Sequence, residues 1–197
     1  MKTKNLALLP AVAVILVLTG CPETNVPRDF GSCPLKLNAE EWNGVWADPA
    51  DGEGMTFKVV DAAKGQLTIT FPAKANKEPE VLQVVINEVN GGETEKKLAF
   101  FIHFDKTAAA AGLGPFNLIR RPENGVLRLW NLRHDVIEAA VKSGELKGTL
   151  TKVPKTKDEA EHQHAQLAAD PANYQRIVDA KFWDWTDPGV FVRTKEK

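Results

Sequence analysis

Hydrophobic and polar positions alternate through the first two thirds of this 197-residue chain. In the stretches 55–59, 67–71 and 98–104, apolar side chains recur at every second position. This period of two is typical of β-strands that bury one face. The stretches 116–120 and 126–131 are predicted to be further strands.

The segments between these strands, such as 48–54 and 121–125, are rich in glycine, proline, asparagine and aspartate, which predicts turns. Short connections favour antiparallel neighbours, because a parallel pair needs a crossover of a dozen residues or more. We therefore predict an antiparallel meander.

The last third of the chain adds helical signals. Asp135, with Glu138 three residues later, has the pattern of a capping box for a helix over 136–142 that Gly144 would end. A second helix is predicted to start at Asp170-Pro171, with aspartate as the N-cap, and to continue to about residue 180.

The segment 160–168 leaves two interpretations open. Its alanine, glutamate and glutamine content favours a helix, whereas pairing with a strand predicted at 146–153 would make it a strand, which we favour slightly. A last strand is predicted at 189–193. The predicted fold class is mainly β (α+β), an antiparallel meander forming a barrel or strongly curled sheet, with two short helices in the C-terminal third.

The tetrapeptide Asn43-Gly44-Val45-Trp46 opens the predicted domain. Its Gly-x-Trp pattern resembles the first strand of lipocalins and related calycin-type barrels, in which the tryptophan plugs one end of the barrel. The helix expected at 136–142 departs from that family, whose main helix follows all eight strands. The segment 126–148 also resembles a group of uncharacterised bacterial lipoproteins, through Leu127-Arg128-Leu129-Trp130 and Glu145-Leu146-Lys147-Gly148.

The amino terminus has the pattern of an export signal: Lys2 and Lys4, the apolar run 6–18, and then Leu18-Thr19-Gly20-Cys21. A retained transmembrane helix is the alternative, but a membrane span needs about 20 apolar residues. Leu-Thr-Gly-Cys resembles the lipobox of bacterial lipoproteins, which implies cleavage before Cys21 and fatty acylation of its sulfur. Pro22, in place of the aspartate associated with inner-membrane retention, favours a lipid anchor in the outer membrane, facing the periplasm.

The predicted organisation is a signal peptide over 1–20, a lipidated flexible tether over 21–40, and one barrel-like domain over 41–197. Prolines, Gly31 and Ser32 suggest the tether, since they offer no periodic apolar face. With Cys21 acylated, Cys33 has no partner for an internal disulfide, which leaves a free thiol, an intermolecular disulfide or reactive-site chemistry.

Cleavage would remove Lys2 and Lys4, leaving 23 of the 25 basic residues against 26 acidic ones, a net charge of about −3. This mildly acidic net charge is not the basic charge that nucleic-acid-binding proteins carry, so no nucleic-acid partner is expected. The expected partners are the membrane, through Cys21, and an envelope protein or a small apolar ligand.

Arginines and tryptophans are the candidate ligand-binding residues. Arg120, Arg121 and Arg128 lie on neighbouring predicted strands, where they could bind an anion; facing solvent or pairing with Asp105 or Glu123 is the favoured alternative. Phe182-Trp183-Asp184-Trp185 cannot all face inward on a regular element, so Trp183 or Trp185 is expected to line a pocket or surface patch, with core capping as the alternative.

Histidines are the candidate metal ligands. His162 and His164 would share one face of a strand, with His103, His134, Glu161 or Asp158 as further ligands, although ordinary surface histidines are the simpler interpretation. In the loop 48–53, Asp48, Asp51 and Glu53 could bind calcium, but the acids lack EF-hand spacing and a solvated turn is favoured.

The common motifs of nucleophilic, phosphate-binding or metallopeptidase catalysis do not occur, so we predict no enzyme and no cofactor. Two functions stay open: an interaction module with a filled barrel, and a lipocalin-like module with a ligand in a hollow barrel. Bulky residues at the expected inner positions favour the filled barrel, namely Leu67, Ile69, Phe71, Phe100, Ile102 and Phe104.

Overall fold

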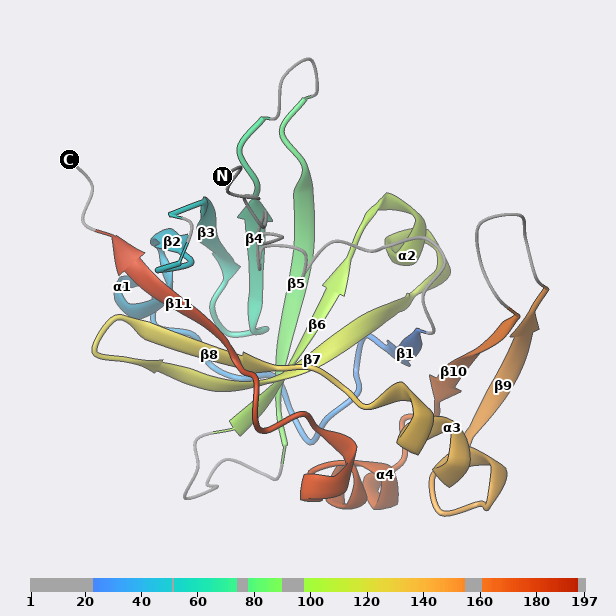
Figure 1. Ribbon diagram of the computed structural model, residues 1–197. Helices are drawn as coiled ribbons and strands as arrows, with labels where there is room; N and C mark the ends of the chain where they lie inside the picture. The colour runs from blue at the N-terminus through green and yellow to red at the C-terminus, as the bar shows by residue number, and fades with distance from the viewer. Residues whose placement is uncertain (1–22, 51, 74–77, 90–97, 155–160, 195–197) are drawn as a thin grey trace, which may run out of the picture.

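The computed structural model describes residues 23–50, 52–73, 78–89, 98–154 and 161–194 (Figure 1). The signal peptide, Cys21, Asp51 and Asp158 lie outside the described residues, and the predictions made for them stay predictions. No helix in the described part of the chain is long and apolar enough to cross a membrane.

The described residues form eleven strands in one sheet. The strands are β1 (Thr24–Pro27), β2 (Gly44–Ala47), β3 (Gly54–Asp61), β4 (Gln66–Thr70), β5 (Val81–Glu88), β6 (Leu98–Phe104), β7 (Leu113–Glu123), β8 (Val126–Trp130), β9 (Gly148–Val153), β10 (His162–Leu167) and β11 (Gly189–Thr194). The helices are α1 (Ala39–Trp42), α2 (Lys106–Ala111), α3 (His134–Lys142) and α4 (Pro171–Arg176), followed by a 3₁₀ turn (Ala180–Phe182).

Eight antiparallel strands close into a barrel, in the order β6-β5-β4-β3-β2-β11-β8-β7, because β7 also pairs with β6. This confirms the predicted fold class. The barrel is compatible with a lipocalin-like architecture, with the departure that α3, β9, β10 and α4 are inserted between the seventh and eighth barrel strands.

Three strands continue the sheet outside the barrel, and we call β1, β10 and β9 the wing. β1 pairs with the start of β7, β10 runs parallel to β1, and β9 pairs antiparallel with β10 (Figure 1). The strand interpretation of the ambiguous segment 160–168 is thus correct, since β10 covers residues 162–167.

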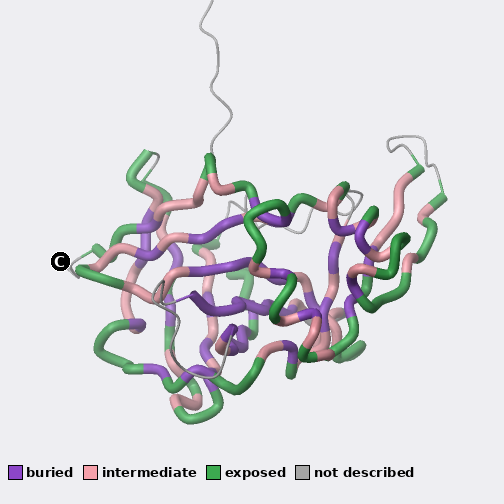
Figure 2. Tube along the Cα trace, turned by 90° about the horizontal axis from the view of Figure 1, so that it is seen from below, coloured by how far each residue is buried: buried purple, intermediate pink, exposed green. Residues whose placement is uncertain are grey.

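Two apolar cores lie on opposite sides of the barrel wall. The barrel core fills the interior with side chains such as Trp46, Phe57, Ile69 and Phe101. The outer core lies between the outer face of β5–β8 and the elements that cover it, namely the N-terminal segment, the wing, α3 and the region after α4. Figure 2 shows the buried residues in the middle of the trace and the exposed ones mainly on its outer loops.

Strand β6 corrects one expectation about the barrel interior. Every residue of β6 is buried, because the strand has a core on each face. Phe100, Ile102 and Phe104, expected inside the barrel, belong to the outer core, whereas Ala99 and Phe101 point inward. Leu67 and Ile69 face the barrel core as expected.

The flexible tether predicted for residues 21–40 is wrong from Thr24 onward. Residues 24–27 form β1, and Pro34 forms an isolated bridge with Asn87 of β5. Two apolar pairs anchor this segment: Val26 and Phe30 are fully buried in the outer core, and Leu35 and Leu37 in the barrel core. Their irregular spacing along the sequence hides these anchors from a search for periodicity.

The Gly-x-Trp pattern has a clear physical basis in the fold. Trp46 is 0 % exposed, and its indole N–H donates to the carbonyl of Trp42 in α1 at 2.9 Å. Gly44 has φ of +131°, and a Cβ there would lie 2.9 Å from Nε of Arg193 on β11. Arg193 pairs with Trp46 across the strands and donates to the Glu40 carbonyl. Glycine is favoured at position 44 because this positive φ is strained for any other residue, and because a Cβ would displace the Arg193 guanidinium.

The helix caps are only partly as predicted. Asp170 caps α4 by accepting from the Ala172 N–H at 2.8 Å, and Pro171 is the first helical residue, but the helix ends at Arg176. Asp135 is not the cap of α3, because the helix already begins at His134 and its N-cap is Arg133, which forms no side-chain cap hydrogen bond.

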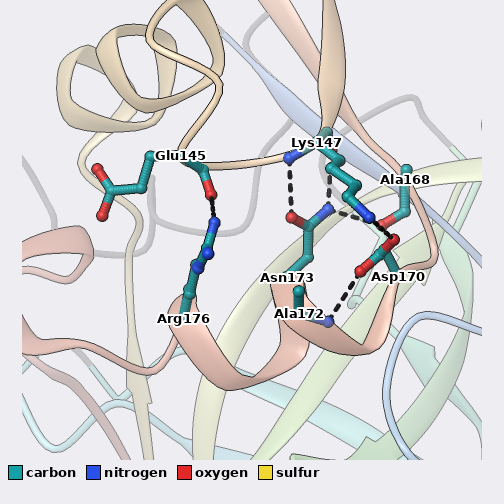
Figure 3. Close-up of polar contacts among 7 residues, drawn as sticks. All are labelled: Glu145, Lys147, Ala168, Asp170, Ala172, Asn173 and Arg176. Carbon is teal, nitrogen blue, oxygen red and sulfur yellow. Dashed lines mark hydrogen bonds and ion pairs between the residues drawn. The ribbon is translucent and has the colours of Figure 1, made fainter.

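One asparagine connects α4 to the chain entering β9 (Figure 3). Asn173 is 1 % exposed; its Oδ1 accepts from the Lys147 N–H at 2.9 Å, and its Nδ2 donates to the carbonyls of Lys147 and Ala168 at 2.8 and 2.9 Å. Lys147 also pairs with Asp170 at 2.5 Å. These contacts hold α4 against the base of the wing.

Candidate functional site

Arg120 and Arg128 lie directly opposite each other on the outer face of β7 and β8. Their neighbours on that face, Leu118 and Trp130, are also paired and belong to the outer core, so the arginines lie at its edge. Both arginines are half-buried. The sequence correctly predicts that they occupy neighbouring strands.

Two tryptophans lie beside this pair. The Arg120 guanidinium carbon is 5.9 Å from the Trp130 ring centroid, within the range of a cation–π contact. The rings of Trp130 and Trp185 lie 5.0 Å apart, and the Trp185 indole N–H donates to the Ala180 carbonyl at 3.1 Å. We call Arg120, Arg128, Trp130 and Trp185 the arginine–tryptophan patch.

Trp130 was not among the ligand-binding residues predicted from the sequence, although the alternation along its strand indicates its orientation. Residues two apart on a strand share a face, so Arg128 and Trp130 had to point the same way once β8 was recognised. Trp183, in contrast, does not reach the patch. It is 2 % exposed, lies 5.8 Å from the Phe116 ring and donates to the Ile177 carbonyl, so it caps the outer core.

The patch contains uncompensated positive charge. Like charges directly opposite each other on two strands are destabilising. Within the described residues, neither Arg120 nor Arg128 forms an ion pair, and the buried Nε of Arg120 has no hydrogen-bond partner. Two guanidinium groups beside an aromatic surface are suited to bind a carboxylate or phosphate oxygen.

The candidate metal ligands His162 and His164 lie on one face of β10, with ring centroids 5.0 Å apart. Nδ1 of His164 accepts from the Glu23 N–H at 3.0 Å, and Nδ1 of His134 lies 3.0 Å from Thr24 Oγ1. These contacts join Glu23 to β10 and Thr24, the first residue of β1, to α3. No group of three or more His, Cys, Asp or Glu side chains suited to a metal occurs among the described residues.

The remaining candidate ligands are dispersed. His103 faces the barrel interior near Phe101 and has a buried Nδ1 without a hydrogen-bond partner in the described part of the chain. Burial lowers the pKa of His103 to about 4, because the charged imidazolium would be desolvated. Glu161 pairs with Lys152 at 3.0 Å, and Asp48 Oδ1 accepts from the Ala50 N–H at 2.7 Å, as in a hydrogen-bonded turn.

Cys33 is exposed and lies beside Glu88, with Sγ 3.4 Å from Oε2. Arg121 binds the other carboxylate oxygen of Glu88 at 3.1 Å. Partial burial and the hydrogen bond to Glu88 raise the pKa of the Cys33 thiol, which disfavours the reactive thiolate.

No family model, curated protein or solved structure matches the chain in the three comparisons made.

Proposed function

We propose that this chain is a lipid-anchored protein of the bacterial envelope that acts through its outer surface, with the barrel as a scaffold. The observation that carries this proposal is the packing of the barrel interior. Trp42, Trp46, Phe57, Phe101 and Phe191 all lie inside it, each 7 % exposed or less. An eight-stranded barrel is just wide enough for side chains to fill.

The interior is also closed at one end by the N-terminal segment. The Leu35 N–H donates to the Ile86 carbonyl at 2.8 Å, and the Leu37 N–H donates to the Ala62 carbonyl at 3.0 Å. These bonds hold Leu35 and Leu37 in the barrel core beside Trp42 of α1.

The arginine–tryptophan patch is the proposed contact surface. Its partner is an envelope protein that presents carboxylates, because paired guanidinium groups favour an anionic partner and tryptophan and arginine are enriched at protein interfaces. The lipid anchor is proposed to be Cys21, on the strength of the lipobox and of the apolar run that precedes it.

A second candidate function is the binding of a small ligand inside the barrel. The observation that favours it is His103, whose buried Nδ1 has no partner among the described residues. A bound polar molecule would satisfy that nitrogen. The bulky barrel core favours the first proposal.

Mass spectrometry of protein purified from host membranes tests both proposals. We expect an intact mass that corresponds to a fatty-acylated chain starting at Cys21, and a native mass with no further small molecule. Cys21→Ser should move the protein out of the membrane fraction. A stoichiometric ligand in the native spectrum would replace the filled-barrel proposal with the second candidate.

The patch is tested by photo-crosslinking in whole cells, with the crosslinking amino acid at the exposed position of Asp187, close in sequence to Trp185. We expect one crosslinked envelope protein, and loss of that product when Arg128→Glu reverses a patch charge. Lys58→Glu on β3 is the matched control, because Lys58 is exposed and lies across the barrel. Equal crosslinking in both variants would exclude the patch as the contact surface.

A further inference from the structure

The chain is fastened to the wing from Glu23 onward. The Glu23 N–H donates to Nδ1 of His164, and its carbonyl accepts from the Ala165 N–H at 2.8 Å. The next residue, Thr24, is 1 % exposed and lies within hydrogen-bonding distance of His134. These contacts leave no free tether between residue 23 and the body of the protein.

Only two residue steps separate Glu23 from Cys21. An extended chain spans at most about 3.6 Å per residue, so these two steps reach about 7 Å. The headgroup layer of one leaflet is about 5 to 7 Å thick, which is half the difference between the full bilayer and its hydrocarbon core. An acylated Cys21 therefore holds Glu23 at the outer surface of the headgroup layer.

The direction of β1 shows which part of the protein meets the membrane. β1 runs parallel to β10, with Thr24 opposite Ala165, so the chain enters at the end of the wing where β10 begins. Thr151 of β9 pairs with His164, next to the entry point, and is exposed. Figure 1 shows the hairpin of β9 and β10 extending away from the barrel on this side.

We infer that the wing lies against the phospholipid headgroups and that the barrel is held beside it in one orientation. This inference rests on the acylation of Cys21 proposed above. The short connection imposes the contact, and charge does not, because Lys152 is paired with Glu161 in the wing and no cluster of basic residues is present among its described residues. The contact therefore persists at high salt.

Fluorescence quenching of the acylated protein in vesicles tests this orientation. The vesicles contain phosphatidylethanolamine, phosphatidylglycerol and a lipid with a nitroxide on its headgroup. In a Cys33→Ser background, Thr151→Cys carries the fluorophore on the wing. Lys58→Cys carries it on β3, which lies four strands from β7 in either direction around the barrel. We expect several-fold stronger quenching of the Thr151→Cys probe than of the Lys58→Cys probe.

A length variant provides the matched control. About twelve glycine and serine residues inserted between Pro22 and Glu23 would extend the root-mean-square reach to about 20 Å. We expect quenching of the Thr151→Cys probe to fall to the level of the Lys58→Cys probe, in a protein with unchanged tryptophan emission. Equal quenching of the two probes at the native length would overturn the inference.

The anchor and the orientation can fail separately. An intact mass is measured first on every preparation. An unmodified Cys21 would refute the proposed acylation, and with it the basis of the inference. An acylated Cys21 with equal quenching would refute the orientation alone and leave the anchor in place.

Discussion

Strand β6 separates two cores that are assembled in different ways. On its inner face, the barrel core is built mainly from strands that follow one another along the chain, from β2 to β8 and then β11, with Leu35, Leu37 and Trp42 added from the segment just before β2. On its outer face, the outer core combines Phe100 and Phe116 of the barrel wall with distant parts of the chain: Val26 and Phe30 near the amino terminus, and Trp183 near the carboxyl terminus.

This difference has consequences for how each region is stabilised. The barrel core depends on hydrogen-bonded neighbours that close a sheet without edges. The outer core depends on segments from both ends of the chain that are laid on the outside of this closed sheet. Hydrogen bonds attach them, such as those of β1 with β7 and of Asn87 with the carbonyls of Arg28 and Phe30, and apolar contacts do the rest. Phe30 illustrates this: it packs against Phe100, Phe116 and Tyr174, with ring centroids 4.9 to 5.2 Å away.

The largest expected effect comes from adjacent phenylalanines of β6. Phe101→Ala opens a cavity in the barrel core, and Phe100→Ala opens one in the outer core; both rings are at most 1 % exposed. We expect each to cost about 3 to 5 kcal/mol in the free energy of unfolding, measured by urea denaturation. Hydrogen exchange should show that Phe100→Ala exposes the amides of β1 and β10 more than those of β3 and β4.

Val60→Ala serves as the control for this pair, because Val60 is 62 % exposed on β3 and its truncation should change stability by about 0.5 kcal/mol or less. If Phe100→Ala and Phe101→Ala gave the same pattern of exchange across all strands, the two cores would form one cooperative unit and the comparison would fail.

The same difference explains what could be predicted from the sequence. The alternation of Leu67 and Ile69 with polar residues reports one buried face, so the barrel strands and the fold class were predictable. Val26 and Phe30 lie among prolines and polar residues without a period, and their burial depends on contacts with residues far away along the chain. The composition of residues 21–40 therefore predicted a flexible tether, whereas Val26 and Phe30 of this segment are part of the outer core.

The candidate site was predictable to a similar degree. The placement of Arg120 and Arg128 on adjacent strands follows from the short turn between them. Which aromatic of the run 182–185 is buried could not be predicted, because it depends on the 3₁₀ turn at 180–182, which directs Trp183 into the outer core.

His103 and His134 allow the two regions to be compared by their response to pH. Burial lowers the pKa of His103 to about 4 and also lowers that of His134, against an ordinary histidine value of 6.5. The unfolded chain therefore binds more protons than the folded chain between pH 6.5 and 4, so stability falls as the pH is lowered through this window. For His103 the loss is on the order of 3 kcal/mol.

Urea denaturation of the wild type, His103→Gln and His134→Gln between pH 7.5 and 4.5 measures these contributions. We expect His103→Gln to remove most of the decrease in stability on acidification, and His134→Gln to remove a smaller part. An unchanged pH profile in His103→Gln would show that His103 is not held neutral inside the barrel.

The smallest of these effects concerns the hydrogen bonds that fix α4 beside the wing. Asn173→Ala removes three hydrogen bonds, to the Lys147 N–H and to the carbonyls of Lys147 and Ala168. The Lys147 N–H loses its acceptor, whereas the two carbonyls still accept from the N–H groups of Ala168 and Asp170. We expect a loss of about 1 to 3 kcal/mol in the free energy of unfolding. Asp170→Ala removes the helix cap and the largely exposed ion pair with Lys147, and should cost about 1 kcal/mol.

Asn173→Asp makes this prediction specific to the amide. The aspartate keeps an acceptor for the Lys147 N–H but places a negative charge against two carbonyl oxygens, so it should destabilise the protein at least as much as alanine does. If both variants were as stable as the wild type, apolar packing alone would hold α4 against the wing. The outer core would then need no polar connection at α4, and the Asn173 hydrogen bonds would only accompany its packing.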